Sequence, residues 1–257
     1  MIFRGMRFAP APGAAQAYAC GEWVMSAALN ADNVDMGTVA LLLMLASAAP
    51  DCSPQFAPLE TGSSSGASNV PFWRKEEAGA WGGAGWLGWT WDNVRLQSVA
   101  FVVRDRPRDA PNDDEYVTVQ TRPDVTFAVR CLPQLSAGPI ASAGIANWSL
   151  QSDGPLRVTV GSRDYAVSIQ SARSDLTDAQ IVLTGEGRRQ VLYSAEGFVD
   201  EPHFDVVWAG DLDRDGKLDL IVNLHRKYSW HPYRLLLSSL AANGDLVGDG
   251  ALFETGD

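Results

Sequence analysis

The stretch Gly210-Asp-Leu-Asp-Arg-Asp-Gly-Lys-Leu-Asp219 alternates aspartate with other residues and then closes on one more aspartate. Its carboxylates are Asp211, Asp213, Asp215 and Asp219. Gly216 permits the sharp turn that returns the last carboxylate to the others, and the Lys217 carbonyl lies at the seventh position. A hard cation such as Ca²⁺ takes roughly six to eight oxygen ligands in a flexible shell. The stretch therefore predicts a calcium site, and such a loop is most often structural.

The residues on either side of the loop predict strands and not helices. An EF-hand needs a glutamate at the twelfth position, which here is Val222. The flanks Phe204–Trp208 and Leu218–Val222 are short apolar runs with many β-branched or aromatic residues. We therefore expect a calcium loop between two strands.

The rest of the chain from residue 94 onward is also typical of strands separated by turns. The expected strands are 94–103, 116–120, 125–130, 156–160, 165–169, 180–183, 190–193, 204–208, 218–224, 233–240 and 246–254. No long amphipathic helix is predicted, and one short helical turn is expected near 174–180. The pattern predicts an all-β fold, an antiparallel sandwich or a barrel-like arrangement.

Composition limits the classes of partner. The chain has 31 acidic and 20 basic residues and a formal charge of −11. Such a chain repels nucleic acid and anionic membranes and favours a cationic partner. No nucleic-acid function is expected.

The N-terminal part predicts export. Val39–Ala49 is an apolar run that ends in a small-residue cleavage pattern, and it is too short to span a membrane. We interpret 1–49 as an extension with a signal peptide, 50–71 as a Pro-, Ser- and Gly-rich linker, and 72–257 as one β-rich domain. A buried helix of a cytosolic domain is the alternative for the apolar run.

Cleavage near Ala48 would remove Cys20 and leave two cysteines, Cys52 and Cys131. In an oxidising compartment these two could form a disulfide, and the alternative is that both are free. Membrane attachment would require lipidation of Cys52, although Pro50-Asp51 is not the small-residue box that such processing prefers.

A tryptophan-rich segment follows the linker. Its members are Trp73, Trp81, Trp86, Trp89 and Trp91. They lack a helical or strict two-residue period, so packing at the end of a sheet is favoured. The alternative is a platform for stacking sugars, which would make the protein a secreted calcium-dependent adhesion or glycan-binding module.

No catalytic motif is evident. The histidines His203, His225 and His231 have no metal-ligand spacing in the sequence, and there is no nucleophile elbow or phosphate-binding glycine loop. The sequence therefore favours a binding protein over an enzyme. A calcium-dependent hydrolase with an unrecognised site is the enzyme alternative.

One hairpin is a candidate for the binding surface. Val158–Ile169 reads as two alternating strands joined at Gly161-Ser-Arg-Asp164, with Tyr165 at the base of the return strand. An exposed tyrosine on a rigid hairpin is a good anchor, and the Ser162 hydroxyl can donate to a carboxylate. The alternative is a plain hairpin with a half-packed tyrosine.

Two resemblances narrow the interpretation. The aspartate loop resembles the calcium-binding repeat of integrin-type, FG-GAP-like propeller blades, in a single copy. Ser162-Arg-Asp-Tyr165 resembles the Ser-Gly-x-Tyr inhibitory loop of invertebrate-type periplasmic lysozyme inhibitors, with Arg163 in place of the glycine. With the secretory start and the late calcium loop, residues 72–257 are similar to periplasmic immunity proteins that Xanthomonas-type bacteria pair with peptidoglycan hydrolases of an antibacterial type IV secretion system.

That resemblance implies a propeller-like, lysozyme-inhibitor-type fold with bound calcium. It also implies that Ser162, Arg163 and Tyr165 enter the cleft of a lysozyme-like peptidoglycan hydrolase. The aspartates and Lys217 would hold Ca²⁺, and the protein would be periplasmic and would have no catalytic activity of its own.

Overall fold

The computed structural model describes residues 52–59, 68–74, 81–82, 85–90, 95–105, 116–121, 125–197, 199–242 and 244–256. The expected signal sequence and Trp91 lie outside these residues. From Pro54 onward the described residues belong to one compact unit.

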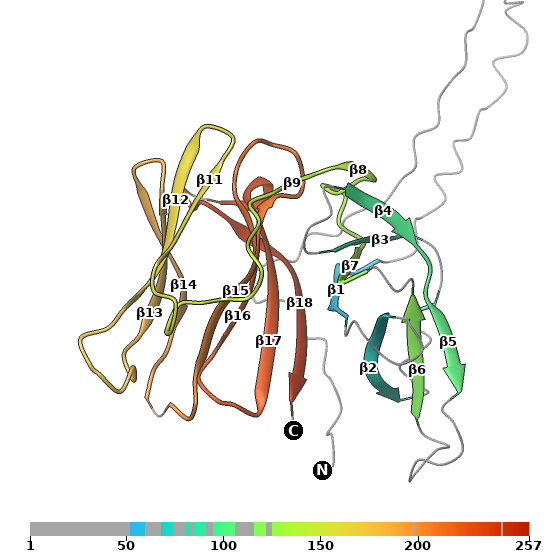
Figure 1. Cartoon of the computed structure of the whole chain (residues 1–257), viewed down its shortest axis with the longest axis horizontal. Coiled ribbons are helices and arrows are strands. Elements are labelled where there is room, and N and C mark those ends of the chain that lie inside the picture. Colours follow the sequence, from blue (N-terminus) through green and yellow to red (C-terminus); the bar gives the residue numbers. More distant parts are fainter. Residues whose placement is uncertain are drawn as a thin grey trace, which may run out of the picture. The chain divides into compact units, whose positions relative to one another are not determined.

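The fold is all-β, as the sequence predicted, and the paired strands form antiparallel sheets (Figure 1). The strands are β1 (Gln55–Pro58), β2 (Ser68–Arg74), β3 (Trp86–Trp89), β4 (Arg95–Val99), β5 (Val102–Asp105), β6 (Tyr116–Thr121), β7 (Phe127–Arg130), β8 (Gly138–Pro139), β9 (Ala141–Ser142), β10 (Trp148–Ser149), β11 (Leu156–Val160), β12 (Arg163–Gln170), β13 (Gln180–Gly185), β14 (Arg188–Ser194), β15 (His203–Asp211), β16 (Asp219–His225), β17 (Trp230–Leu237) and β18 (Gly248–Gly256). Among the described residues the single helix is the 3-10 turn η1 (Ser238–Leu240). The helical turn expected near 174–180 is made of turns and bends instead.

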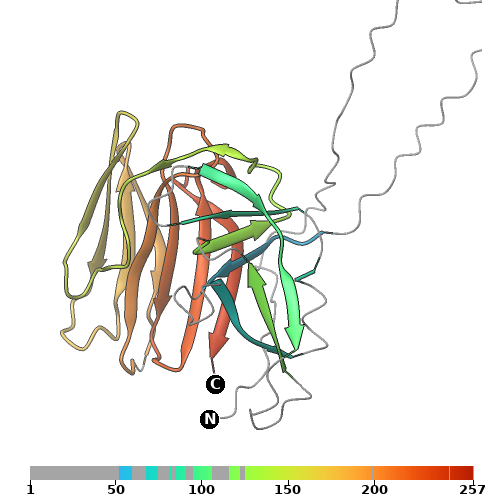
Figure 2. The ribbon, with the colours of Figure 1, turned by 45° about the vertical axis from the view of Figure 1, so that its right-hand side comes forward.

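The strands divide into four sheets. A five-stranded sheet has the order β1-β7-β3-β4-β8, and a three-stranded sheet has the order β2-β6-β5. The four strands β11 to β14 follow one another in a meander, and β10-β15-β16-β17-β18 with β9 form a six-stranded sheet. Figure 2 shows the same grouping from a second direction. In the described part of the chain these sheets do not close into a barrel or a propeller.

The six-stranded sheet is covered on both faces because alternate residues enter two different cores. Ile221, Trp208 and Leu235 pack with residues of the N-terminal sheets, including Trp89 and Phe127. The alternating residues of the same strands pack against β11 to β14. β16 is therefore buried at every position, including its polar residues Asp219, Asn223 and His225.

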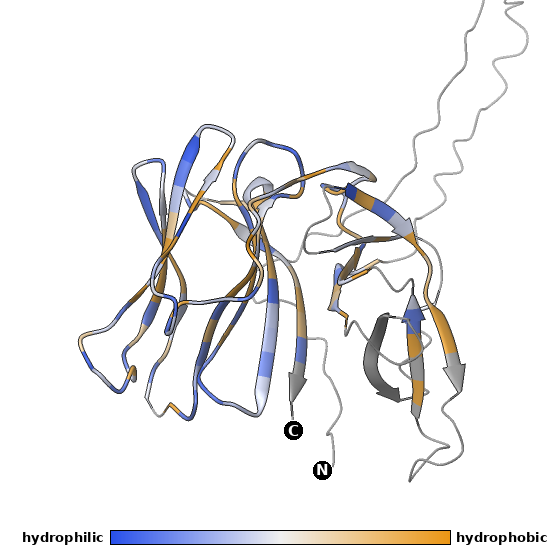
Figure 3. Cartoon of the chain, viewed as in Figure 1, coloured by the Kyte–Doolittle hydropathy of each residue, from blue (hydrophilic) through white to orange (hydrophobic). Residues whose placement is uncertain are grey.

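Two details differ from the sequence interpretation. The expected run 94–103 is broken at Ala100-Phe101 into β4 and β5. The start of β5 is hydrophobic (Figure 3), yet Val102 and Val103 are 50% and 41% exposed.

The linker expected at 50–71 is wrong in two places, because β1 lies within it and β2 begins in it at Ser68. β1 pairs with β7, and Phe56 is fully buried in the first core. The four-residue strand β1 was not predicted, because the residues around it are rich in proline and serine. Such a strand has too few residues for its periodicity to be recognised, and its stability comes from the sheet that it joins.

Candidate functional site

The aspartate loop joins β15 to β16, so the prediction of a loop between two strands is confirmed. The ladder reaches Gly210 opposite Asp219 and ends there. Gly216 has a φ of +78° and Arg214 a φ of +69°. This left-handed backbone is easy for glycine and explains how nine residues reverse the chain.

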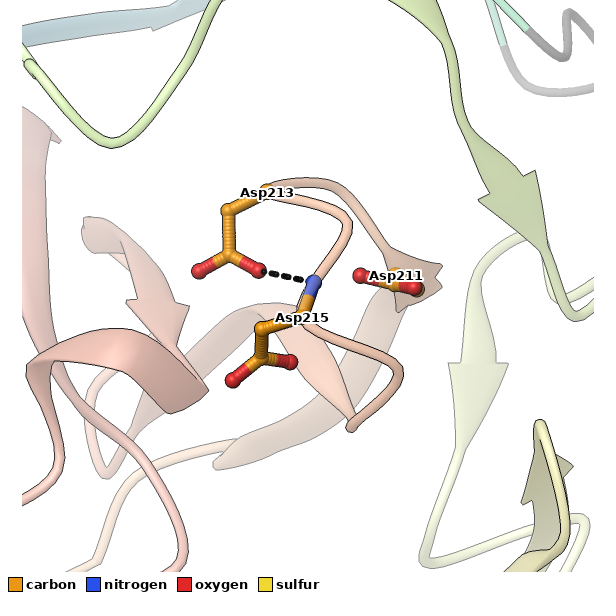
Figure 4. Close-up of side chains that lie close together, drawn as sticks. All are labelled: Asp211, Asp213 and Asp215. Atoms are coloured by element: carbon orange, nitrogen blue, oxygen red, sulfur yellow. Dashed lines mark hydrogen bonds between the residues drawn. The ribbon is translucent and has the colours of Figure 1, made fainter.

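Carboxylates of the loop accept hydrogen bonds from its own backbone. The amide of Asp215 donates to Asp213 Oδ1 at 3.2 Å, which is the dashed line in Figure 4. The amide of Gly216 donates to Asp211 Oδ2 at 3.0 Å, and that of Lys217 donates to Asp215 Oδ1 at 2.8 Å. These bonds hold the three carboxylates in place without a metal ion.

The three carboxylates form a group that could hold a cation. Asp211, Asp213 and Asp215 each offer an oxygen within 4.8 Å of the others. Within the described part of the chain, Asp211 Oδ1 and Asp213 Oδ2 are buried and have no hydrogen-bond partner. Burial raises the pKa of the Asp211 carboxyl above its usual value. Unpaired buried carboxylate oxygens are costly, and a hard cation removes that cost.

Asp219, the fourth predicted ligand, lies outside that group and braces the loop. Its side chain is fully buried. Asp219 Oδ2 accepts the amides of Leu212 and Asp213 at 2.7 and 3.2 Å. Asp219 Oδ1 accepts the amide and the hydroxyl of Ser238 at 2.8 and 3.0 Å. Desolvation, followed by the nearby Asp213 charge, raises the pKa of the Asp219 carboxyl to about 7.

Lys217 contributes a charge that the sequence interpretation did not consider. Its ammonium lies 3.5 Å from Asp215 Oδ2. The role of its carbonyl as a ligand stays a prediction. An ammonium at this position partly neutralises the loop when no divalent cation is bound.

Ser238 is a site residue that the sequence analysis missed. Besides its two bonds to Asp219, its hydroxyl donates to Asp215 Oδ1 at 2.9 Å. It lies 19 residues beyond Asp219, in η1, and nothing in the local sequence marks it. Only the pairing of β16 with β17 brings it to the loop.

The hairpin expected at Val158–Ile169 forms, with β11 and β12 in register from Leu156 opposite Val167 to Val160 opposite Arg163. Its tip is exposed at Gly161, Ser162 and Asp164.

Tyr165 is not an exposed anchor, so this part of the prediction is wrong. The residue is 5% exposed and belongs to the second core. Its ring packs against Gly185, where an added Cβ would lie only 2.3 Å from Tyr165 Cδ1. The Tyr165 hydroxyl donates a hydrogen bond to Glu186 Oε1 at 3.3 Å. Strand alternation turns Tyr165 inward together with Val167.

Arg163 connects the hairpin to the aspartate loop. One guanidinium nitrogen donates to the Gly216 carbonyl at 2.7 Å, and Nε lies 2.7 Å from Glu186 Oε1. Gly161 also lies close, since a Cβ there would be 3.3 Å from the Gly216 carbonyl oxygen. Two segments 53 positions apart in the sequence therefore meet at the aspartate loop.

The tryptophan segment is a core feature where the structure describes it. Trp81, Trp86 and Trp89 are at most 1% exposed. Trp81 and Trp86 stack with centroids 4.9 Å apart, and Trp89 meets Trp208 edge to face at 6.2 Å. These rings cannot stack with a sugar. The side chain of Trp73 lies outside the described residues, as does Trp91.

Cys52 and Cys131 are joined in a disulfide, which is one of the two alternatives left open by the sequence. Such a bond is typical of an oxidising compartment. Across the described ranges, no helix is long and apolar enough to cross a membrane.

The histidines also differ from their sequence interpretation. Although no linear spacing suggested it, the rings of His203, His225 and His231 contact one another at one end of β15, β16 and β17.

Comparison of the chain with protein-family models, with curated proteins and with solved structures finds no match.

Proposed function

We propose that this chain is a calcium-binding inhibitor of a peptidoglycan hydrolase, acting in the periplasm as an immunity protein. The observation that carries the proposal is the hydrogen bond from Arg163 to the Gly216 carbonyl. It joins the tip that resembles an inhibitory loop to the loop that is suited to calcium. Occupation of the loop would then set the position of the tip.

The chemistry of the aspartate loop supports calcium over other cations. Its ligands are carboxylate oxygens with two unpaired buried atoms, and it offers no sulfur or imidazole. Oxygen-only sites suit Ca²⁺ or Mg²⁺, and a loop with several carboxylates and carbonyls in irregular positions suits the larger, less demanding Ca²⁺. Bound calcium would stabilise the loop and the tip attached to it.

The binding surface in this proposal differs from the one implied by resemblance alone. Ser162 and Asp164 are exposed at the tip, and the Arg163 side chain is 40% exposed. These residues would contact the enzyme, while the buried Tyr165 would support them from behind. The net charge of −11 supports a basic partner such as a lysozyme-like hydrolase, because opposite charge speeds association.

Export and fold are part of the same proposal. The disulfide supports an oxidising compartment, and the periplasm is the one that contains peptidoglycan. The antiparallel sheets agree with the all-β part of a lysozyme-inhibitor-type fold, and across the described residues they do not close into a propeller. Attachment to a membrane is not part of the proposal, because Cys52 is engaged in the disulfide and is therefore not a lipidation site.

The test is a peptidoglycan lysis assay. Purified protein with calcium is added to a panel of lysozyme-type enzymes and to any hydrolase encoded beside its gene. Stoichiometric inhibition is expected, and Ser162→Ala with Arg163→Ala should weaken it. Arg157→Ala is the matched control, since Arg157 is exposed on the neighbouring strand β11. No inhibition of any enzyme would refute the proposal.

A further inference from the structure

All three histidines of the chain meet on one face of the six-stranded sheet. His203 on β15 is directly opposite His225 on β16. Asn223 on β16 is opposite Tyr233 on β17. Two residues further along this antiparallel pair, His225 and His231 are opposite each other on the same face. The ring centroids are 4.9 Å apart for His203 and His225, and 4.8 Å apart for His225 and His231. Those of His203 and His231 are 6.0 Å apart.

Each histidine ring also lies near a polar group outside the cluster. His225 Nδ1 lies 2.7 Å from the Lys227 carbonyl oxygen, and a carbonyl can only accept, so Nδ1 carries the proton. Burial lowers the pKa of His231, and the backbone of Tyr228 acts against that effect to raise it. His203 Nδ1 lies 3.6 Å from Asp205 Oδ2. Histidines that bind metals commonly donate their other nitrogen to a carbonyl or carboxylate in this way.

The cluster contains buried polar atoms that nothing satisfies. His225 is fully buried, and among the described residues its Nε2 has no hydrogen-bond partner. With the proton on Nδ1, Nε2 has a buried lone pair that accepts no hydrogen bond. Asn223, one row further along β16 and 6% exposed, has an equally unpartnered Oδ1. Buried acceptors without donors are costly and point to a missing electrophile.

We propose that His203, His225 and His231 bind a divalent transition-metal ion, Zn²⁺ in the first instance, in a second metal site distinct from the aspartate loop. Three imidazoles suit zinc and leave its fourth position open to water or another ligand. An all-nitrogen site does not suit Ca²⁺, so the two sites select different ions. His203 and Asp211 are eight positions apart on β15, roughly 26 Å at about 3.3 Å per residue.

Binding requires a small rearrangement of the rings. Among the described residues, the aspartate group is the one in which a ligand atom from each residue lies within 4.8 Å of the others. The ligand atoms of the three imidazoles are therefore not all that close together. The His203 side chain is 49% exposed and can rotate toward Nε2 of His225.

The test uses the full chain without a histidine tag, stripped with chelator and returned to buffer containing excess calcium. Titration with Zn²⁺ in a calorimeter should show about one zinc ion per chain, and zinc should raise the melting temperature. His203→Ala and His231→Ala should each weaken binding by at least about tenfold. Asp205→Asn keeps all three ligands and should weaken binding by about 10-fold to 100-fold through loss of the carboxylate that orients His203.

Asp213→Asn is the matched control, because it changes the aspartate loop and should leave zinc binding intact. Absence of binding by the folded protein would overturn the proposal, as would binding that the histidine substitutions leave unchanged. The inhibition of hydrolases plays no part in these readouts, so the zinc site stands or falls independently of the proposed function.

Discussion

The guanidinium of Arg163 donates a hydrogen bond of 2.7 Å to the carbonyl oxygen of Gly216. Gly216 is the residue at which the aspartate loop turns, with a φ of +78°. Arg163 begins β12 and also pairs with Glu186. The bond therefore ties the conformation of an exposed hairpin tip to the conformation of the aspartate loop.

Loss of that bond should weaken calcium binding. Arg163→Ala removes a partly exposed charged donor, which contributes about 1 kcal/mol after allowance for solvent screening. We expect calcium affinity to fall by about fivefold, measured by calorimetry. Arg157→Ala on β11 should leave the affinity unchanged. An unaltered affinity in the Arg163 variant would show that hairpin and loop are not coupled.

Removal of calcium should lower the melting temperature, because an ion bound only by the native state stabilises that state. At a calcium concentration of 100 times the Kd the gain is about 2.7 kcal/mol. Asp211→Asn or Asp213→Asn should abolish the difference between melts in calcium and in chelator. Identical melts of the unsubstituted protein under both conditions would contradict the calcium assignment.

Asp219 should matter even without metal. Asp219→Asn replaces one carboxylate oxygen with an NH₂ group. In one orientation this group would face the amides of Leu212 and Asp213, and in the other it would face the donors of Ser238. Two buried donors would then face a donor, and we expect a loss of about 2–4 kcal/mol in the free energy of unfolding. The loss should appear in chelator, by urea denaturation. Asp245→Asn, at an exposed turn, is the control and should change little.

Stability of the metal-free protein should fall in mild acid because of His225. Desolvation, and next the neighbouring His231, lowers the pKa of His225 to about 4 from 6.5. Between these values the unfolded chain binds a proton that the native chain does not, so stability decreases as pH falls from 6.5 to 4. We expect a loss of about 1–3 kcal/mol from this group.

The measurement is urea denaturation in chelator across that pH range. His225→Gln should give a flatter profile than the unsubstituted protein, whereas substitution of the exposed His203 should not. Parallel profiles for the unsubstituted protein and His225→Gln would contradict the assignment, because carboxylates contribute equally to both.

The disulfide should contribute a large share of the stability. It closes a loop of 79 residues between Cys52 and Cys131, for which chain entropy predicts about 4.5 kcal/mol. Cys52→Ser with Cys131→Ser should therefore lower the midpoint of urea denaturation. Because β1 lies three residues beyond Cys52, its docking on β7 should loosen too, which hydrogen exchange would detect. Equal midpoints would show that the bond is not formed in solution.

Local patterns predicted well wherever a few neighbouring residues determine the outcome. The strand at Leu156–Val160 alternates buried and exposed side chains, and its predicted bounds are those observed. The turn at Gly216 followed from the aspartate spacing, and the strands beside it followed from their short apolar, β-branched runs. The strand β1 was missed because four residues give too little period, and only pairing with β7 stabilises it.

The sequence by itself determined that the protein is all-β and that a carboxylate loop joins two of its strands, because alternation, turn residues and ligand spacing act over short distances along the chain. The tertiary structure alone decided which side chains are hidden and which meet. It buried Tyr165 and the tryptophans, brought Ser238 to Asp219, and placed three histidines in one row. Each of these depends on the register between strands far apart in the chain, which no local pattern encodes.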